Sequence, residues 1–227
     1  LGLETTALGF VAGFTGKAIE DGLAAQGIHT DFIHLPEGNS RINVKVKHGD
    51  ETEINGQGPV ITEEAINELF AKLATLTKED ILVLAGSIPN TLPEDIYEKI
   101  LARLESKGIR VVVDATKDLL LNVLKYHPFL IKPNNHELGE MFGTVCKTDE
   151  DIVHYAKKLQ EKGAVNVLIS MAGDGAILIT EDGQNIKMGT PKGKVVNSVG
   201  AGDSMVAGFI TGYIRGGNYE EALKSGT

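Results

Sequence analysis

Asp80-Ile-Leu-Val-Leu-Ala-Gly86 contains an uninterrupted apolar run, 81–85, that is followed by a glycine. Such a segment is typical of a parallel strand that helices cover on both faces. Helical patterns, with apolar residues three and four positions apart, lie before it at 63–76 and after it at 93–107. The segment therefore predicts one step of an alternating helix and strand fold.

The same alternation continues on the C-terminal side. Strand patterns occur at 109–114, 128–132 and 164–170, helical patterns at 119–124, 135–142 and 149–162, and a hairpin pattern at 175–180 and 185–188. This order predicts a three-layer α/β/α sandwich with a mainly parallel sheet. Ligands of such sheets bind at the carboxyl ends of the strands, so we expect the chemistry there.

The N-terminal part differs after a predicted strand at 6–12 and a helix at 15–26. Residues 30–60 alternate polar and apolar side chains around turns, which predicts a small antiparallel sheet with one polar face. Inserted between helices, it is best interpreted as a lid that excludes water from a site. Arg41 in this sheet is either a solvated edge residue or a cation that binds a phosphate through two nitrogens.

Composition limits the class of protein. At 227 residues the chain can bury one core, so we expect a single domain over 1–227 with the lid as an insertion at about 30–60. A net charge of −9 argues against a nucleic-acid partner, and no apolar run approaches the ~20 residues of a membrane helix. One cysteine and no visible signal peptide favour a reducing cytoplasm.

Asn197-Ser-Val-Gly-Ala-Gly-Asp-Ser204 opens an apolar helical pattern at 205–214. Gly200 and Gly202 allow a tight turn and close approach of a ligand to the backbone. The first amides of the helix would stabilise an anion, and Asp203 could accept a proton from a substrate hydroxyl as it attacks phosphorus. The alternative is a glycine-rich turn with an aspartate that the helix dipole favours.

Lys132-Pro-Asn134-Asn-His-Glu137 ends a predicted strand and opens a helix. A lysine directed at phosphates, with Asn134 and Glu137 ordering a hydrated Mg²⁺, suits phosphoryl transfer. Ser170-Met171-Ala-Gly173-Asp174-Gly175 also ends a strand, and its glycines could surround a nucleotide. Gly86 and Ser87 end the opening segment, where the Ser87 hydroxyl could bind a sugar or phosphate oxygen; such a turn alone is usually structural.

The segment 197–204 resembles the signature of the PfkB carbohydrate kinases of the ribokinase-like superfamily. Its Asn197-Ser198 start is similar to the branch that contains 1-phosphofructokinase and tagatose-6-phosphate kinase. The resemblance implies that Gly200, Ala201 and Gly202 form an anion hole and that Asp203 is the catalytic base. It also implies an Asn-x-x-Glu motif at Asn134 and Glu137, nucleotide contacts by Lys132 and by the loop at 170–175, and phosphosugar contacts by Arg41 and by Gly86 and Ser87.

The resemblance therefore implies a kinase with ATP and Mg²⁺ that phosphorylates fructose 1-phosphate. Tagatose 6-phosphate and fructose 6-phosphate remain alternative acceptors, and a non-catalytic phosphosugar- or nucleotide-binding regulator is the alternative from another class. We expect no nucleic-acid or membrane partner, whereas the lid exposes edges that a second copy of the chain could cover. Compared with the family, we also expect the chain to be cut at both ends, without an N-terminal sugar-binding segment and a C-terminal section.

Overall fold

The computed structural model describes residues 2–48, 50–86, 88–193, 195 and 198–227. The chain forms two compact units. The larger unit contains Thr77–Ser87 and Tyr97–Thr227, and the smaller unit contains Gly2–Leu76 and Ile88–Ile96. The predicted residues Ser87 and Asn197 lie outside the described residues.

A six-stranded sheet is the centre of the larger unit, in the order β12-β11-β10-β9-β8-β7. The strands are β7 (Ile81–Ala85), β8 (Arg110–Asp114), β9 (Leu130–Ile131), β10 (Asn166–Ser170), β11 (Ala176–Ile179) and β12 (Asn185–Met188). Strands β7 to β10 are mutually parallel, whereas β11 and β12 form an antiparallel extension. The predicted, mainly parallel sheet is confirmed.

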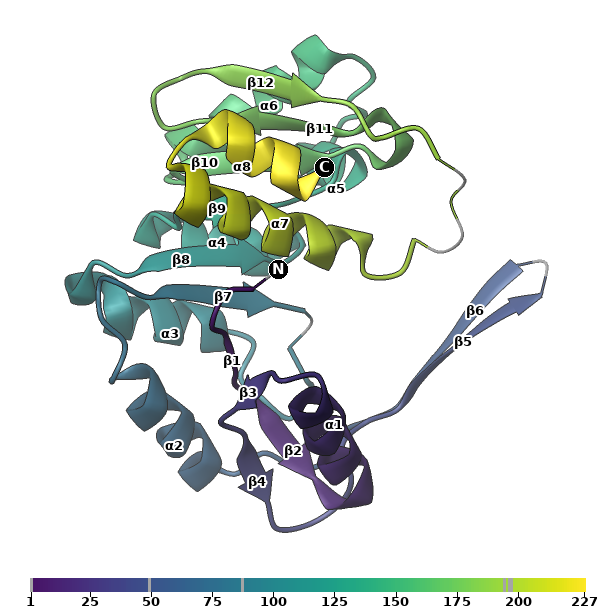
Figure 1. The fold of residues 1–227 in the computed structure, drawn as a ribbon, viewed down its shortest axis with the longest axis vertical. Helices are drawn as coiled ribbons and strands as arrows, with labels where there is room; N and C mark the ends of the chain where they lie inside the picture. Colours follow the sequence, from purple (N-terminus) through teal and green to yellow (C-terminus); the bar gives the residue numbers. More distant parts are fainter. Residues whose placement is uncertain (1, 49, 87, 194, 196–197) are drawn as a thin grey trace. The chain divides into compact units, whose positions relative to one another are not determined.

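Helices cover both faces of this sheet. They are α3 (Ile96–Leu104), α4 (Lys117–Val123), α5 (Asn135–Met141), α6 (Asp149–Glu161), α7 (Ala201–Gly216) and α8 (Tyr219–Gly226). Figure 1 shows α7 and α8 across one face and α6 behind the other. On the α7 side, Leu130 and Leu168 share a buried cluster with Phe209 and Leu223. The side chains that alternate with them along the strands, such as Ile131, are also buried, which confirms three layers.

Close packing of α8 against α7 fixes the helix that carries the signature. A Cβ added to Gly208 would lie 2.2 Å from the carbonyl oxygen of Ser225, and one added to Gly212 would lie 2.7 Å from that of Glu221. Both distances are too short for any side chain, so these glycines let the two backbones touch. The contact determines how closely α8 lies against α7 beyond its first turn.

Strand β7 differs from its prediction. It is the last strand of this sheet in the described chain, and Val83 is 41% exposed. The expectation of a strand buried on both faces is therefore wrong for Val83. A continuous apolar run records hydrophobicity but not the number of neighbouring strands, so a central strand and an edge strand cannot be told apart.

The smaller unit pairs short parallel strands around a compact apolar core. Strand β1 (Thr6–Ala7) pairs with β3 (His29–Thr30), and β2 (Phe10–Ala12) pairs with β4 (Ile33–Leu35). Helices α1 (Gly13–Ala25) and α2 (Glu63–Leu73) complete the unit. The buried residues are Val11, Ala12, Ile33, Leu35, Ile61, Ala65, Leu69 and Leu73.

Among the described residues of the smaller unit, antiparallel pairing is confined to a hairpin, β5 (Asn43–His48) and β6 (Asp50–Asn55), with Val44 opposite Ile54. The prediction of an antiparallel sheet over 30–60 is therefore wrong for Ile33–Leu35, which pairs in parallel with β2. Alternating burial in β4 arises because helices and strands cover only one side, and alternation does not reveal a strand's partner. Arg41 lies before β5 and not within a strand, so its predicted place in the sheet is also wrong.

Candidate active site

Four strands of the larger unit end at one edge of the sheet. Gly86 follows β7, Asp114 ends β8, Lys132 follows β9 and Ser170 ends β10. Because these strands are parallel, their carboxyl ends must lie side by side, as they do in other sheets of this kind. The sequence motifs at 132, 134 and 170 therefore converge as predicted: Asn134 and Ser170 form an isolated parallel bridge.

Lys132 is the central cation of this edge. Only 6% of the residue is exposed, and its Nζ lies 3.2 Å from Oδ1 of Asp114. The same ammonium lies against the first turn of α7, because a Cβ placed on Gly202 would be 3.0 Å from Lys132 Nζ. Lys132 thus links the ends of β8 and β9 to the start of the signature helix.

The α7 helix begins without a side-chain cap. Gly200 is its N-cap residue, with φ 76° and ψ 4°, a left-handed conformation that costs an L-residue about 1–2 kcal/mol. The tight turn predicted for the glycines is thus found at Gly200. Gly202 lies inside the helix, where the absence of a Cβ allows the Lys132 ammonium to approach the backbone.

Asp203 occupies the third position of α7, with an exposed side chain. A helix start presents backbone amides that lack intrahelical acceptors and carries a partial positive charge. Ala201 N donates to Ser198 O at 3.2 Å, which closes the turn before the helix. The first turn thus combines amides, the neighbouring Lys132 ammonium and an exposed carboxylate, an arrangement that suits an anionic ligand with an attacking hydroxyl.

Asp114 is the residue of this edge to which the sequence assigned no role. Burial is the main influence on its carboxyl group and raises its pKa, while attraction to Lys132 lowers the pKa. The negative charges of Asp203 and Glu137 raise the pKa of Asp114 further. The three carboxylates are therefore close enough to interact. The signal that could have found Asp114 is its place at the end of an apolar strand, as with Lys132 and Ser170.

Asn134 and Glu137 begin α5 as a capping box. Asn134 Oδ1 accepts from the amides of His136 and Glu137 at 2.9 and 2.8 Å, and Glu137 Oε2 accepts from Asn134 N at 2.8 Å. The two predicted magnesium residues thus hold each other's backbone. Among the described residues no group of three or more His, Cys, Asp or Glu side chains is placed to hold a metal ion. Mg²⁺ in kinases needs only one or two carboxylates beside waters and phosphates.

The loop after β10 contains two glycines whose surroundings differ. Ala172–Asp174 forms a 3-10 turn, and Met171 N donates to Gly175 O at 2.8 Å. A Cβ on Gly175 would lie 1.9 Å from Met188 O, so packing against β12 requires this glycine. Gly173 has open space where a Cβ would be. Gly173 is therefore the glycine of this loop that is free to face a ligand.

The loop after β7 is anchored by a tyrosine. Tyr97 Oη donates to the carbonyl oxygens of Ala85 and Gly86, at 3.0 and 3.3 Å. Burial and, to a lesser degree, the charge of Asp114 raise the pKa of Tyr97, so the hydroxyl stays a donor at neutral pH. Gly86 has φ 87° and open space at its Cβ position. Arg41, the other predicted sugar-binding residue, is exposed and belongs to the smaller unit.

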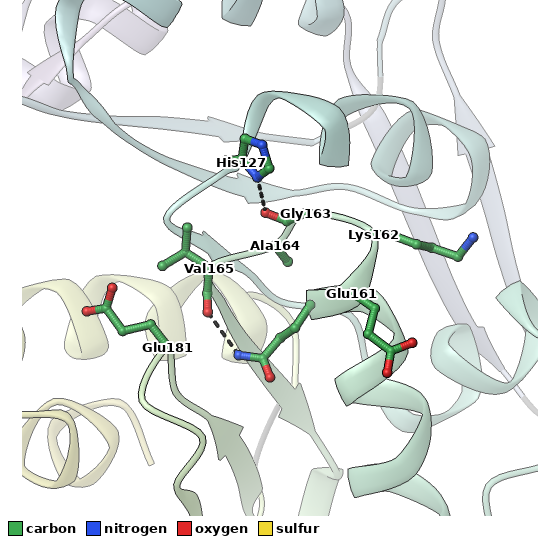
Figure 2. A pocket seen from close by; sticks show the side chains of 8 residues that line it. His127, Glu161, Lys162, Gly163, Ala164, Val165 and Glu181 are labelled. Atoms are coloured by element: carbon green, nitrogen blue, oxygen red, sulfur yellow. Dashed lines mark hydrogen bonds between the residues drawn. The ribbon is translucent and has the colours of Figure 1, made fainter.

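A pocket of about 430 Å³ lies at the other edge of the same sheet (Figure 2). Its lining residues come before β9 and β10, except for Glu181, which follows β11. They include His127, whose Nδ1 lies 3.0 Å from Gly163 O. None of the predicted site residues lines it. Cys146, also without a predicted role, is buried, and burial raises the pKa of its thiol. No helix in the described ranges is both long and apolar enough to span a membrane.

Comparison with known proteins gives the family. The model of the pfkB family carbohydrate kinases matches residues 1–227. The chain belongs to this family. It is therefore a carbohydrate kinase, a phosphotransferase, and the resemblance predicted from the signature is confirmed.

Individual relatives agree with this family assignment. The 1-phosphofructokinase of Bacillus subtilis is 51% identical over 224 residues, which cover 99% of this chain and 73% of that protein. The D-tagatose-1-phosphate kinase of Bacillus licheniformis is 39% identical over 225 residues, covering 99% and 73%. A solved structure of a Staphylococcus aureus protein is 46% identical with a TM-score of 0.89, covering 99% of this chain and 72% of that one. The ribokinase-like fold predicted for this pfkB chain is confirmed.

Proposed function

We propose that this kinase transfers the γ-phosphoryl group of ATP to a hydroxyl of fructose 1-phosphate and forms fructose 1,6-bisphosphate. The choice of this substrate rests on the 51% identity to a 1-phosphofructokinase over nearly the whole chain. We further treat residues 1–227 as one kinase domain, since the family model extends over both units.

Asp203 is the general base in this proposal. Its exposed carboxylate at the start of α7 accepts the proton of the attacking sugar hydroxyl. The amides of Gly200, Ala201 and Gly202 stabilise the charge of the transferring phosphoryl group, that of Ala201 by sharing its hydrogen with Ser198 O, because donors at a helix start favour negative charge as it develops. No covalent enzyme intermediate is needed, since phosphoryl transfer depends mainly on positioning and electrostatics.

Lys132 and the loop after β10 bind the nucleotide. The space left by the missing Cβ of Gly202 lets the Lys132 ammonium reach the anion hole, which fits a phosphate group. Ser170, Met171, Gly173, Asp174 and Gly175 form the neighbouring loop, in which Gly173 has open space at its Cβ position. ATP supplies the transferable phosphoryl group when it is bound.

Glu137 and Asn134 are the proposed residues for Mg²⁺. Asn134 Oδ1 and Glu137 Oε2 accept backbone hydrogens in the capping box, so these residues act on the ion through their remaining oxygen lone pairs and through ordered waters. Arg41, Gly86 and Ser87 bind the sugar phosphate. An arginine suits a phosphate because its fork of N–H donors can bind two oxygens at once.

A second candidate acceptor is tagatose 1-phosphate. A relative that is 39% identical is a D-tagatose-1-phosphate kinase, and the two sugars differ only in the configuration of one hydroxyl. Tagatose 6-phosphate and fructose 6-phosphate, the alternatives from the sequence, and a non-catalytic binding regulator are separated from the main proposal by the same experiment.

We also propose that the hairpin β5–β6 takes part in a homodimer. Its Val44, Val46 and Ile54 are exposed by 46%, 46% and 60%. An isolated two-stranded hairpin is only marginally stable, so a second copy covering this apolar face would stabilise it. The cytoplasm is the proposed location, because one buried cysteine and no internal disulfide suit a reducing compartment.

The test measures ADP release from MgATP with a panel of acceptors. The panel contains fructose 1-phosphate, tagatose 1-phosphate, tagatose 6-phosphate, fructose 6-phosphate and unphosphorylated fructose, with Asp203→Asn as the matched control. We expect the highest kcat/KM for fructose 1-phosphate and its loss in the variant. If another acceptor gave the highest kcat/KM, that sugar would be the substrate in place of fructose 1-phosphate. Nucleotide binding without turnover of any acceptor would support the non-catalytic regulator instead.

A further inference from the structure

We infer that Asp114 is a positioning residue for phosphoryl transfer: it holds the Lys132 ammonium against the first turn of α7. The inference rests on the proposed kinase function and adds a residue that does not belong to any of the sequence motifs. The side chain of Lys132 is buried, with only 8% of it exposed. A buried ammonium is stable only when it is paired or hydrogen-bonded, and Asp114 Oδ1 at 3.2 Å supplies that partner.

The direction of the Lys132 side chain has a geometric cause. β8 and β9 pair in parallel, with Val113 opposite Ile131, so the residues that follow this pair, Asp114 and Lys132, leave adjacent strand ends together. From there the ammonium reaches the backbone of Gly202, where a Cβ would lie 3.0 Å away. Asp114 thus holds Nζ by an ion pair on one side, and the absence of a side chain on Gly202 leaves room for Nζ on the other side.

The charges around Asp114 explain why it pairs with Lys132. Asp203 and Glu137 both repel its negative charge, whereas Lys132 attracts it, so Lys132 is the favourable partner. The carboxylate of Asp114 carries the same sign of charge as nucleotide phosphates, so its favourable contact is with the lysine 3.2 Å away. The expected role is therefore indirect: Asp114 acts on the phosphates through Lys132.

A double-mutant cycle tests this indirect role. It uses Asp114→Asn, Lys132→Met and the variant with both changes, in the full chain, with kcat, the KM values and calorimetric ADP affinity as readouts. We expect Asp114→Asn alone to lower kcat about 10- to 100-fold, with the KM for the sugar phosphate changed less than about 2-fold, because a misplaced catalytic group costs rate. In the Lys132→Met background the same change should alter kcat and ADP affinity by less than about 2-fold.

Two controls make the outcome decisive. Asp149 forms an ion pair with Lys187 at 2.5 Å, also within the larger unit and without any motif residue, so Asp149→Asn removes the same kind of charge and should leave kcat unchanged. If Asp114→Asn lowers the melting temperature, the double variant should restore it, because removing both charges leaves neither unpaired. Rates are then compared below the melting range of all variants.

Equal losses from Asp114→Asn with and without Lys132 would overturn the inference, because Asp114 would then act independently. Unchanged kcat and ADP affinity in Asp114→Asn would overturn it as well. Failure of the proposed function has a different signature: the wild type would phosphorylate no sugar of the panel, while the ADP-affinity cycle would still report whether Asp114 acts through Lys132.

Discussion

Two helices begin at the same edge of the sheet in opposite ways. α5 starts with Asn134 and Glu137, which satisfy each other's backbone amides in a capping box. α7 starts at Gly200 in a left-handed conformation, without a side-chain cap, and with the Lys132 ammonium beside its first turn. A helix start can thus be stabilised by the side chains of its own first turn, or left uncapped so that its amides stay available to an anion.

The largest expected effect is at the open helix start. Asp203→Asn removes the proposed base but keeps the size of the side chain, so kcat should fall about 100- to 10,000-fold. ADP affinity should change little, because the amides of the turn and Lys132 remain. Steady-state kinetics and calorimetry measure both. A variant with near wild-type kcat would show that Asp203 is only a helix-start carboxylate.

Gly202→Ala tests whether the open start depends on the lysine. The new Cβ would lie 3.0 Å from Lys132 Nζ, so the ammonium must move, and kcat should fall about 10- to 100-fold. The melting temperature should hold or rise, because alanine is favoured over glycine in a helix by up to about 1 kcal/mol. In a Lys132→Met background the substitution should have little further effect; an equal loss there would exclude a collision with the lysine as the cause.

The capped start is tested at Asn134. Asn134→Ala removes the acceptor for two amides and should lower the free energy of unfolding by about 1 kcal/mol, whereas Asn134→Ser retains a capping oxygen and should lower it less. Thermal unfolding measures this difference. Since Asn134 is also a proposed magnesium residue, we expect kcat to fall in both variants. Full activity of the serine variant would leave Asn134 with the capping role alone.

The smallest expected effect is the contribution of Asp114, which interacts with a carboxylate on each of the two helices, to the pH dependence of the melting temperature. Its pKa is raised in the folded state above the ordinary value of 3.8, mainly by burial. A raised carboxyl pKa gives stability that is present below the unfolded-state pKa and is lost as pH rises through the folded-state pKa. The melting temperature of the wild type minus that of Asp114→Asn should therefore decrease as pH rises above about 4. A difference that increases with pH would contradict the direction of the shift.

Much of the larger unit was predictable because its signals are local. Uninterrupted apolar runs at 81–85 and 111–113, helix starts such as Thr148 with its acidic first turn, and glycines at turns each depend on neighbours in sequence. The alternation of these elements then leaves a parallel sheet as the solution. The motif residues at 132, 134 and 170 could be placed at one edge for the same reason, since parallel strands all end there.

Pairing between distant segments could not be predicted in this way. Ile33–Leu35 alternates like an antiparallel strand but pairs in parallel with Phe10–Ala12, because burial of one face gives the same period whichever strand lies alongside. Arg41 was assigned to a strand on the same pattern, although pairing begins only at Asn43.

The sequence by itself determined the alternating fold, the family and the residue types of the candidate site. Only the tertiary structure decided which of those residues act on one another: Asp114 and Lys132 are 18 positions apart, and Gly202 is 70 positions beyond the lysine. Their meeting depends on strand register and on the packing of α7 against α8, which bring together groups whose spacing in the chain carries no signal. Electrostatic and steric contacts act through space, so their partners are found only in the fold.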